Sequence, residues 1–163
     1  MDRSDKQLAE MVLRRLCADG QIDGIRFGPV LQILISHVNQ PDHAPINGQV
    51  YLNLGSGWRV FESRPASFPD GEDELPELSN LEQIQAIIDL RERTVAKVEL
   101  AESEPHLILT LDDGSVLFVN GKHDTYECWQ MGVAFSGDMW QVIACPGGGV
   151  AIWAPNSFVE AGA

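Results

Sequence analysis

The chain has 163 residues, of which 44% are hydrophobic and 21% are charged, a composition typical of a globular protein that can bury a core. Its formal net charge of −13 argues against binding of nucleic acid, which requires clustered Lys and Arg to contact the phosphates. This charge also disfavours binding to anionic membranes. The same charge favours attraction to a basic partner, although acidity that serves solubility alone is the simpler interpretation.

The cysteines and the amino terminus bear on the compartment. Cys17, Cys128 and Cys145 are odd in number and lack zinc-binding spacing, which indicates free thiols in a reducing compartment. The first ten residues, MDRSDKQLAE, are polar and lack the apolar centre of a signal peptide. No apolar run approaches the ~18 residues that a membrane span needs. We therefore expect one cytoplasmic domain over residues 1–163.

Residues 4–18 are predicted to form a helix. Ser4 and Gln7 have the spacing of a capping box, and Gly20 supplies a left-handed stop. One apolar stripe is expected to face the core, formed by Leu8, Met11, Val12 and Leu16.

Residues 22–62 have the alternation of β-strands. Two strands are predicted within residues 22–38, joined across Gly28 and Pro29, and a loop is predicted over residues 40–48. Residues 49–62 are predicted to form a hairpin that turns at Gly55-Ser56-Gly57.

The carboxyl-terminal part is the best-defined stretch of strands. Residues 94–101 lead into a hairpin over residues 107–119, whose Asp113-Gly114 pair suits the positive φ of a type I′ turn. Further strands are predicted at residues 126–131, 140–145 and 150–153, and a frayed tail at residues 156–163.

The two predicted hairpins align without a gap. LNLGSGWRVF and LTLDDGSVLF share four of ten residues, and Leu52 falls on Leu109. An internal duplication and two hairpins that obey the same turn rules both explain this. The expected fold class is α+β: two mainly antiparallel hairpin or meander units at residues 22–62 and 94–154, an amino-terminal helix, and a connecting helix at residues 79–93.

An acidic stretch precedes that connecting helix. Residues 63–77 are either a solvated, mobile loop or a docking surface for a basic partner; the acids concerned are Asp70, Glu72, Asp73, Glu74 and Glu77. Ser79 and Glu82 have the spacing of a capping box. A core-facing stripe is expected to follow, formed by Leu81, Ile84, Ile87 and Ile88.

Two tryptophans at strand positions are candidate contacts with a partner. Trp58 and Trp129 would anchor an interface if their rings were exposed. Packing in the core is the other explanation for both.

A metal or nucleophile site is the main chemical alternative. His123, Asp124, Glu127 and Cys128 are types of residue that hold transition metals, but strand alternation sends Glu127 and Cys128 to opposite faces. A Cys128–His123 nucleophile pair lacks a recognisable third group. The glycine-rich loop from Pro146 to Gly149 could bind an anion, but no Walker lysine follows it. A looser set comprises His37, Asp42 and His43. We predict no cofactor.

The carboxyl-terminal pattern consists of the Asp-Gly hairpin, YECWQMG and CPGGGVAIW. It resembles small uncharacterised bacterial β-rich proteins of unknown function, some of which are acidic and similar to immunity proteins. The resemblance covers roughly the last 60 residues and implies no catalytic positions. It implies a non-enzymatic binding protein, such as an inhibitor of a basic toxin. The alternative is a small enzyme or ligand-binding domain with a pocket near His123, Cys128 and the glycine-rich loop. The oligomeric state is left open.

Overall fold

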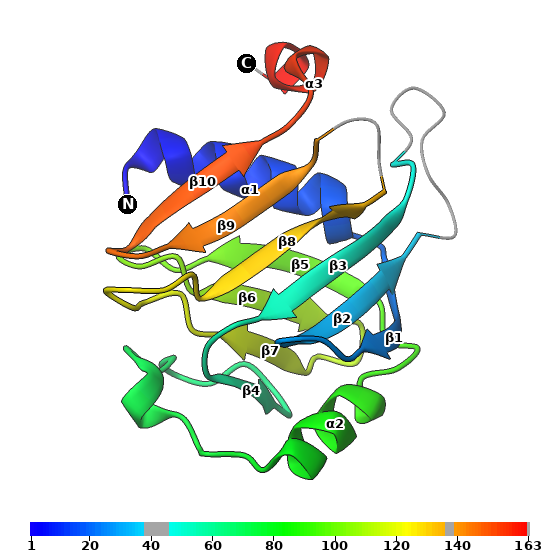
Figure 1. Cartoon of the computed structure of the whole chain (residues 1–163), viewed down its shortest axis with the longest axis vertical. Coiled ribbons are helices and arrows are strands. Elements are labelled where there is room, and N and C mark those ends of the chain that lie inside the picture. The colour runs from blue at the N-terminus through cyan, green and yellow to red at the C-terminus, as the bar shows by residue number, and fades with distance from the viewer. Residues whose placement is uncertain (38–45, 136–138, 163) are drawn as a thin grey trace.

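The computed structural model describes residues 1–37, 46–135 and 139–162. Within these ranges the chain forms three helices and ten strands, and the strands make two antiparallel sheets (Figure 1). The mixed α+β class that the sequence predicts is therefore confirmed. No helix of the described residues has the length and apolar character needed to cross a membrane.

The larger sheet has six strands in the order β1-β2-β3-β8-β9-β10. It consists of two three-stranded meanders that meet where β3 pairs with β8. Side chains alternate between a buried face and a half-exposed face along β3. The strands are β1 (Gln21–Arg26), β2 (Leu31–Ser36), β3 (Gln49–Leu54), β8 (Trp129–Ala134), β9 (Gln141–Cys145) and β10 (Gly149–Trp153).

The smaller sheet has four strands in the order β4-β7-β6-β5. These are β4 (Trp58–Phe61), β5 (Val95–Leu100), β6 (Leu107–Leu111) and β7 (Val116–Val119). The predicted Asp-Gly hairpin joins β6 to β7, and the N–H of Leu111 donates to the carbonyl of Ser115. The turn is not the predicted type I′, which needs a positive φ at both central residues, because Gly114 has a positive φ of 87° and Asp113 does not. Every residue of β7 is buried, because apolar layers cover both faces of this sheet.

The predicted hairpin over residues 49–62 is wrong. β3 belongs to the six-stranded sheet and β4 to the four-stranded sheet, so Gly55-Ser56-Gly57 carries the chain from one sheet to the other. The segments at residues 22–62 and 94–154 each contribute strands to both sheets. The sequence alignment therefore compares a crossover with a true hairpin, and an internal duplication is not confirmed.

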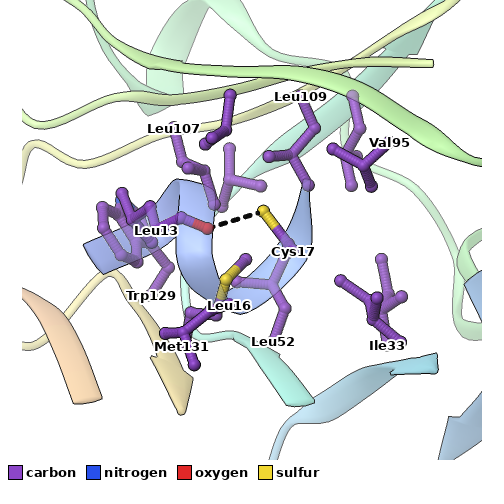
Figure 2. Packing of buried hydrophobic residues seen from close by; sticks show 14 of the residues in the cluster. Leu13, Leu16, Cys17, Ile33, Leu52, Val95, Leu107, Leu109, Trp129 and Met131 are labelled. Atoms are coloured by element: carbon purple, nitrogen blue, oxygen red, sulfur yellow. Dashed lines mark hydrogen bonds between the residues drawn. The ribbon is translucent and has the colours of Figure 1, made fainter. Parts of the chain in front are cut away.

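The helix α1 (Arg3–Cys17) packs between the two sheets. Figure 2 shows Leu16 and Cys17 with Val95, Leu107 and Leu109 of the smaller sheet on one side. On the other side lie residues of the larger sheet, among them Ile33, Leu52, Trp129 and Met131. Helix and sheets thus share one apolar core.

The ends of α1 differ from the prediction. Asp2 is the N-cap: its Oδ1 accepts the N–H of Ser4 at 2.7 Å and the hydroxyl of Ser4 at 2.6 Å. The left-handed residue after the helix is Asp19, at φ 59°, rather than Gly20. Gly20 serves close packing instead, because a Cβ there would lie 2.6 Å from Cγ2 of Ile35.

The helix α2 (Asn80–Asp89) has the predicted capping box of Ser79 and Glu82, but it is shorter than expected. Only part of its apolar stripe reaches the core: Ile87 is buried, Ile84 is half-buried, and Leu81 and Ile88 are exposed. A single turn of 3₁₀-helix, η1 (Glu72–Glu74), precedes it.

The predicted frayed tail is also wrong. Residues 156–162 form the helix α3 (Asn156–Gly162). The ring of Phe158 packs edge-on against Trp140 with centroids 4.9 Å apart, so an aromatic contact attaches this helix to the core.

Candidate functional site

The acidic stretch is held against the smaller sheet rather than left as a free loop. Phe68 stacks on Phe118 of β7, with ring centroids 5.5 Å apart and an interplanar angle of 10°. Leu75 is buried in the same cluster, beside Ile108 and Val116. These apolar contacts fix residues 68–75 on the outer face of the sheet and leave the intervening acids exposed.

We call the five predicted acids, Asp70, Glu72, Asp73, Glu74 and Glu77, the acidic ledge; all five are exposed. The turn η1 sets three of them side by side, because the N–H of Glu74 bonds to the carbonyl of Gly71 and the N–H of Leu75 to the carbonyl of Glu72. The predicted acidic patch is thus one ordered segment of backbone.

Glu72 connects the ledge to two other parts of the chain. Its Oε1 accepts the backbone N–H of Gly57 at 2.6 Å, and its Oε2 accepts the hydroxyl of Tyr126 at 2.6 Å. A Cβ on Gly57 would lie 2.9 Å from Cγ of Glu72 and 3.0 Å from Cδ1 of Leu75, so a side chain at this position would displace its neighbours. The crossover between the sheets, the ledge and the segment before β8 therefore meet at one carboxylate.

Two grooves border the ledge. The first has a volume of about 670 Å³ and runs between the crossover at residues 54–58 and the segment at residues 72–78. The second has a volume of about 550 Å³ and lies between residues 70–74 and residues 122–125. Glu72 and Asp73 line both grooves, so carboxylates face each of them.

The ledge carries negative charge, and Lys122, a cation that lines its second groove, pairs with Glu104 instead. Within the described ranges, no ion pair includes a carboxylate of the ledge. The pairs lie elsewhere and join Lys6 to Glu102, Arg14 to Glu10, Arg64 and Lys97 to Glu99, Arg93 to Asp113, and Lys122 to Glu104. Unpaired surface carboxylates produce a local field that attracts cations.

The candidates around His123 lie beside the ledge. His123 stacks on Tyr126 with ring centroids 3.4 Å apart, and its Nδ1 accepts the N–H of Thr125 at 3.1 Å. The glycine-rich loop is adjacent, since the N–H of Gly147 donates to the carbonyl of His123 at 2.9 Å. Asp124 is exposed at the second groove. The structure therefore brings the acidic stretch, His123 and the glycine-rich loop to one end of the molecule.

Cys128 lacks the environment that a nucleophile or metal ligand needs. Its side chain is fully buried in the core, and burial raises the pKa of its thiol to about 11, with nearby Glu72 adding to the effect. A thiol with a raised pKa stays protonated near neutral pH, whereas nucleophiles and metal ligands are thiolates. In the described part of the chain, no group of three His, Cys, Asp or Glu side chains is arranged to hold a metal ion.

The tryptophans proposed as exposed anchors are buried. Trp58 is 5% exposed and Trp129 is 1% exposed. The indole N–H of Trp129 donates to the carbonyl of Pro105 at 2.7 Å, so its polar group is satisfied inside the protein. Both rings fill the core, and the proposal that they contact a partner does not fit their position.

Several residues that shape this surface were not predicted. Phe68 and Leu75 anchor the ledge, Tyr126 holds Glu72, and Lys122 lines the second groove. Two isolated apolar residues in a charged stretch are a signal that could have revealed the anchors.

The looser histidine set is only partly described, because Asp42 and His43 lie outside the described residues. Nε2 of His37 lies 2.6 Å from the carbonyl oxygen of Leu16 at the end of α1. His37 directly follows β2, so this contact links the end of that strand to the end of α1.

Comparisons of the chain with protein-family models, with curated protein sequences and with solved structures found no match. The distinguishing feature of this surface is an ordered row of carboxylates that lies between two grooves, and none of these carboxylates belongs to an ion pair among the described residues.

Proposed function

We propose that the protein is a non-enzymatic binding protein that engages a basic protein partner through the acidic ledge. One observation carries the proposal: five exposed carboxylates without ion-pair partners among the described residues lie on a segment that apolar contacts hold in place. An ordered charged surface loses less conformational entropy on binding than a mobile loop would.

The grooves give the partner's side chains somewhere to bind. A Lys or Arg that enters the first groove meets Glu72, Asp73 and Glu77. One that enters the second groove meets Glu72 and Asp73 together with Lys122. Arg suits such sites because its guanidinium can donate two parallel hydrogen bonds to one carboxylate. The net charge of −13 adds long-range attraction that speeds the encounter.

In its finer form the proposal is a cytoplasmic, immunity-type inhibitor that neutralises a basic toxin. The three free thiols support a reducing compartment. The acidic ledge supports a basic target, because complementary charge gives both a fast association rate and selectivity against acidic proteins.

The test begins with capture of the partner from a lysate of the source organism, followed by its identification and purification. Association rates are then measured by stopped-flow mixing over a range of salt concentrations. A variant with Asp70→Asn, Asp73→Asn, Glu74→Gln and Glu77→Gln should associate about tenfold more slowly at low salt, and added salt should slow the wild type. Glu72 is kept, since its hydrogen bonds to Gly57 and Tyr126 support the fold.

The matched control removes the same amount of charge from exposed acids elsewhere: Asp5→Asn, Glu92→Gln, Asp112→Asn and Glu160→Gln. Both variants change the net charge from −13 to −9, that is −13 + 4. The association rate should fall more in the ledge variant than in the control. Equal falls in the association rate would show that only the total charge matters. An association rate that does not change with salt would refute the electrostatic mechanism.

A further inference from the structure

β10 is an edge strand of the six-stranded sheet and differs from the other sheet edges. Proteins usually protect edges from pairing with other chains by charged side chains or bulges. The other edge strands follow this rule: β1 has Asp23, Arg26 and a register shift, β4 has Arg59, and β5 has Lys97, Glu99 and a register shift. β10 is Gly-Val-Ala-Ile-Trp, without a charge, and its pairing with β9 is regular.

The sheet surface beside β10 is also uncharged. The half-exposed face of the larger sheet points away from α1 and the smaller sheet, toward the viewer in Figure 1. At its centre the hydroxyl of Tyr51 accepts the amides of Gln130 at 2.6 Å and Gln141 at 3.4 Å. One cross-strand row on this face runs from Ala151 through Ile143, Gln130, Asn53 and Gln32, and it reaches a charged residue at Arg26 of β1, at the opposite edge of the sheet. A chain with a net charge of −13 thus offers an unusually neutral region here.

The sequence of β10 is complementary to itself in the antiparallel direction. If Ala151 faces its own copy, Val150 lies opposite Ile152, which pairs two β-branched residues. Gly149 then lies opposite Trp153. The space above Gly149 is open, with no atom within 4 Å of a Cβ placed there, and Trp153 is 41% exposed. An aromatic ring that covers a cross-strand glycine is a known way to stabilise a sheet.

We propose that two copies of this chain pair antiparallel through β10 about a two-fold axis, which joins their larger sheets into one continuous sheet. Such an interface is isologous, as in most homodimers. Like charge opposes association of two acidic copies, and it opposes it least where both surfaces are neutral. The inference uses an edge strand outside the acidic ledge and stands independently of the proposed function.

The test is the molar mass of the purified chain, measured by light scattering after size-exclusion chromatography over a range of protein concentrations. The expected mass is twice the chain mass of 17.9 kDa. Ala151→Glu and Ala151→Lys should each give monomers, because each places two like charges opposite one another at the two-fold axis. An equimolar mixture of the two variants should restore the dimer, because the charges are then opposite.

The matched control is Gln32→Glu and Gln32→Lys, which place the same charges in the same cross-strand row but on β2. These variants should remain dimeric. Circular dichroism checks that each variant is folded, and Trp153→Ala, which adds no charge, should weaken the dimer about tenfold or more.

The response to added salt distinguishes association through β10 from partner binding at the acidic ledge. Added salt should strengthen the dimer, because it screens repulsion between acidic copies, whereas it should weaken binding of a basic partner. A wild-type monomer at every concentration would overturn the inference. A dimer that survives both charges at Ala151 would place the interface elsewhere and overturn it equally.

Discussion

At the scale of single residues, Glu72 and Tyr126 form the contact that joins the candidate site to the rest of the fold. The Tyr126 hydroxyl donates to Glu72, whose other oxygen accepts the N–H of Gly57. Partial burial raises the pKa of Tyr126 to about 12, and the hydrogen bond and negative charge of Glu72 act in the same direction. The contact therefore depends on a protonated tyrosine.

A pH dependence follows from this raised pKa. The neutral phenol stabilises the folded state fully below the unfolded pKa of about 10, and this contribution is lost as the pH rises toward about 12. The free energy of unfolding should therefore fall more steeply over that range in the wild type than in Tyr126→Phe. The ultraviolet absorbance of tyrosinate reports this ionisation directly. The difference in absorbance between the wild type and Tyr126→Phe should rise with pH and reach its midpoint near pH 12. Glu72→Gln should lower that midpoint, and a midpoint near 10 in the wild type would contradict the contact.

At the scale of elements, the acidic stretch at residues 63–77 shows how a charged segment acquires a defined position. Its anchors, Phe68 and Leu75, pack on the outer face of β6 and β7. The grooves exist because this segment stays against the sheet. The ledge is thus an element held by side-chain burial, since its regular backbone structure is a single turn.

Leu75→Ala should test that dependence. Truncating this leucine is expected to lower the free energy of unfolding by about 2 kcal/mol. This value is at the lower end of the range for buried Leu→Ala substitutions, because Leu75 is 9% exposed and lies at the margin of the core. Partner association should slow as well, because the carboxylates lose their fixed spacing. Leu81→Ala is the control: Leu81 is 78% exposed, so its replacement should change stability by less than about 0.5 kcal/mol. Equal effects of the two substitutions in urea denaturation would show that the segment is not anchored.

At the scale of the whole molecule, α1 packs against both sheets in one shared apolar core. Leu16 is fully buried, and Figure 2 shows it close to Leu52, Trp129 and Met131 of the larger sheet. The neighbouring Cys17 lies closer to Val95 and the smaller sheet. Neither sheet keeps a complete core if the helix leaves.

Leu16→Ala should therefore destabilise the entire chain, by about 2 to 5 kcal/mol, through lost burial and the cavity left behind. Tryptophan fluorescence and far-ultraviolet circular dichroism should still report one coincident transition in urea, shifted to lower denaturant. Separate midpoints for the two probes would show that the sheets unfold independently.

Local signals predicted the local structure. The capping box of Ser79 and Glu82 begins α2, and the Asp113-Gly114 pair turns the β6–β7 hairpin, because each depends on residues within a few positions of one another. The acids of the ledge were also predicted, since like charges in a polar stretch remain at the surface. These features need no distant partner.

The tertiary structure decided the features that depend on distant partners. Gly55-Ser56-Gly57 permits either a hairpin or a crossover, and only the packing of two sheets around α1 selects the crossover. Alternation along a strand shows that one of its faces is buried, but it does not show on which face Trp58 and Trp129 lie. The assembled core shows that both rings lie on the buried side. Glu72 and Tyr126 are 54 positions apart, and no local rule brings them together. The sequence by itself thus determined the composition, the charge and most of the helices and strands, because these follow from neighbouring residues. Pairing between distant strands created the ledge, its grooves and the neutral edge at β10.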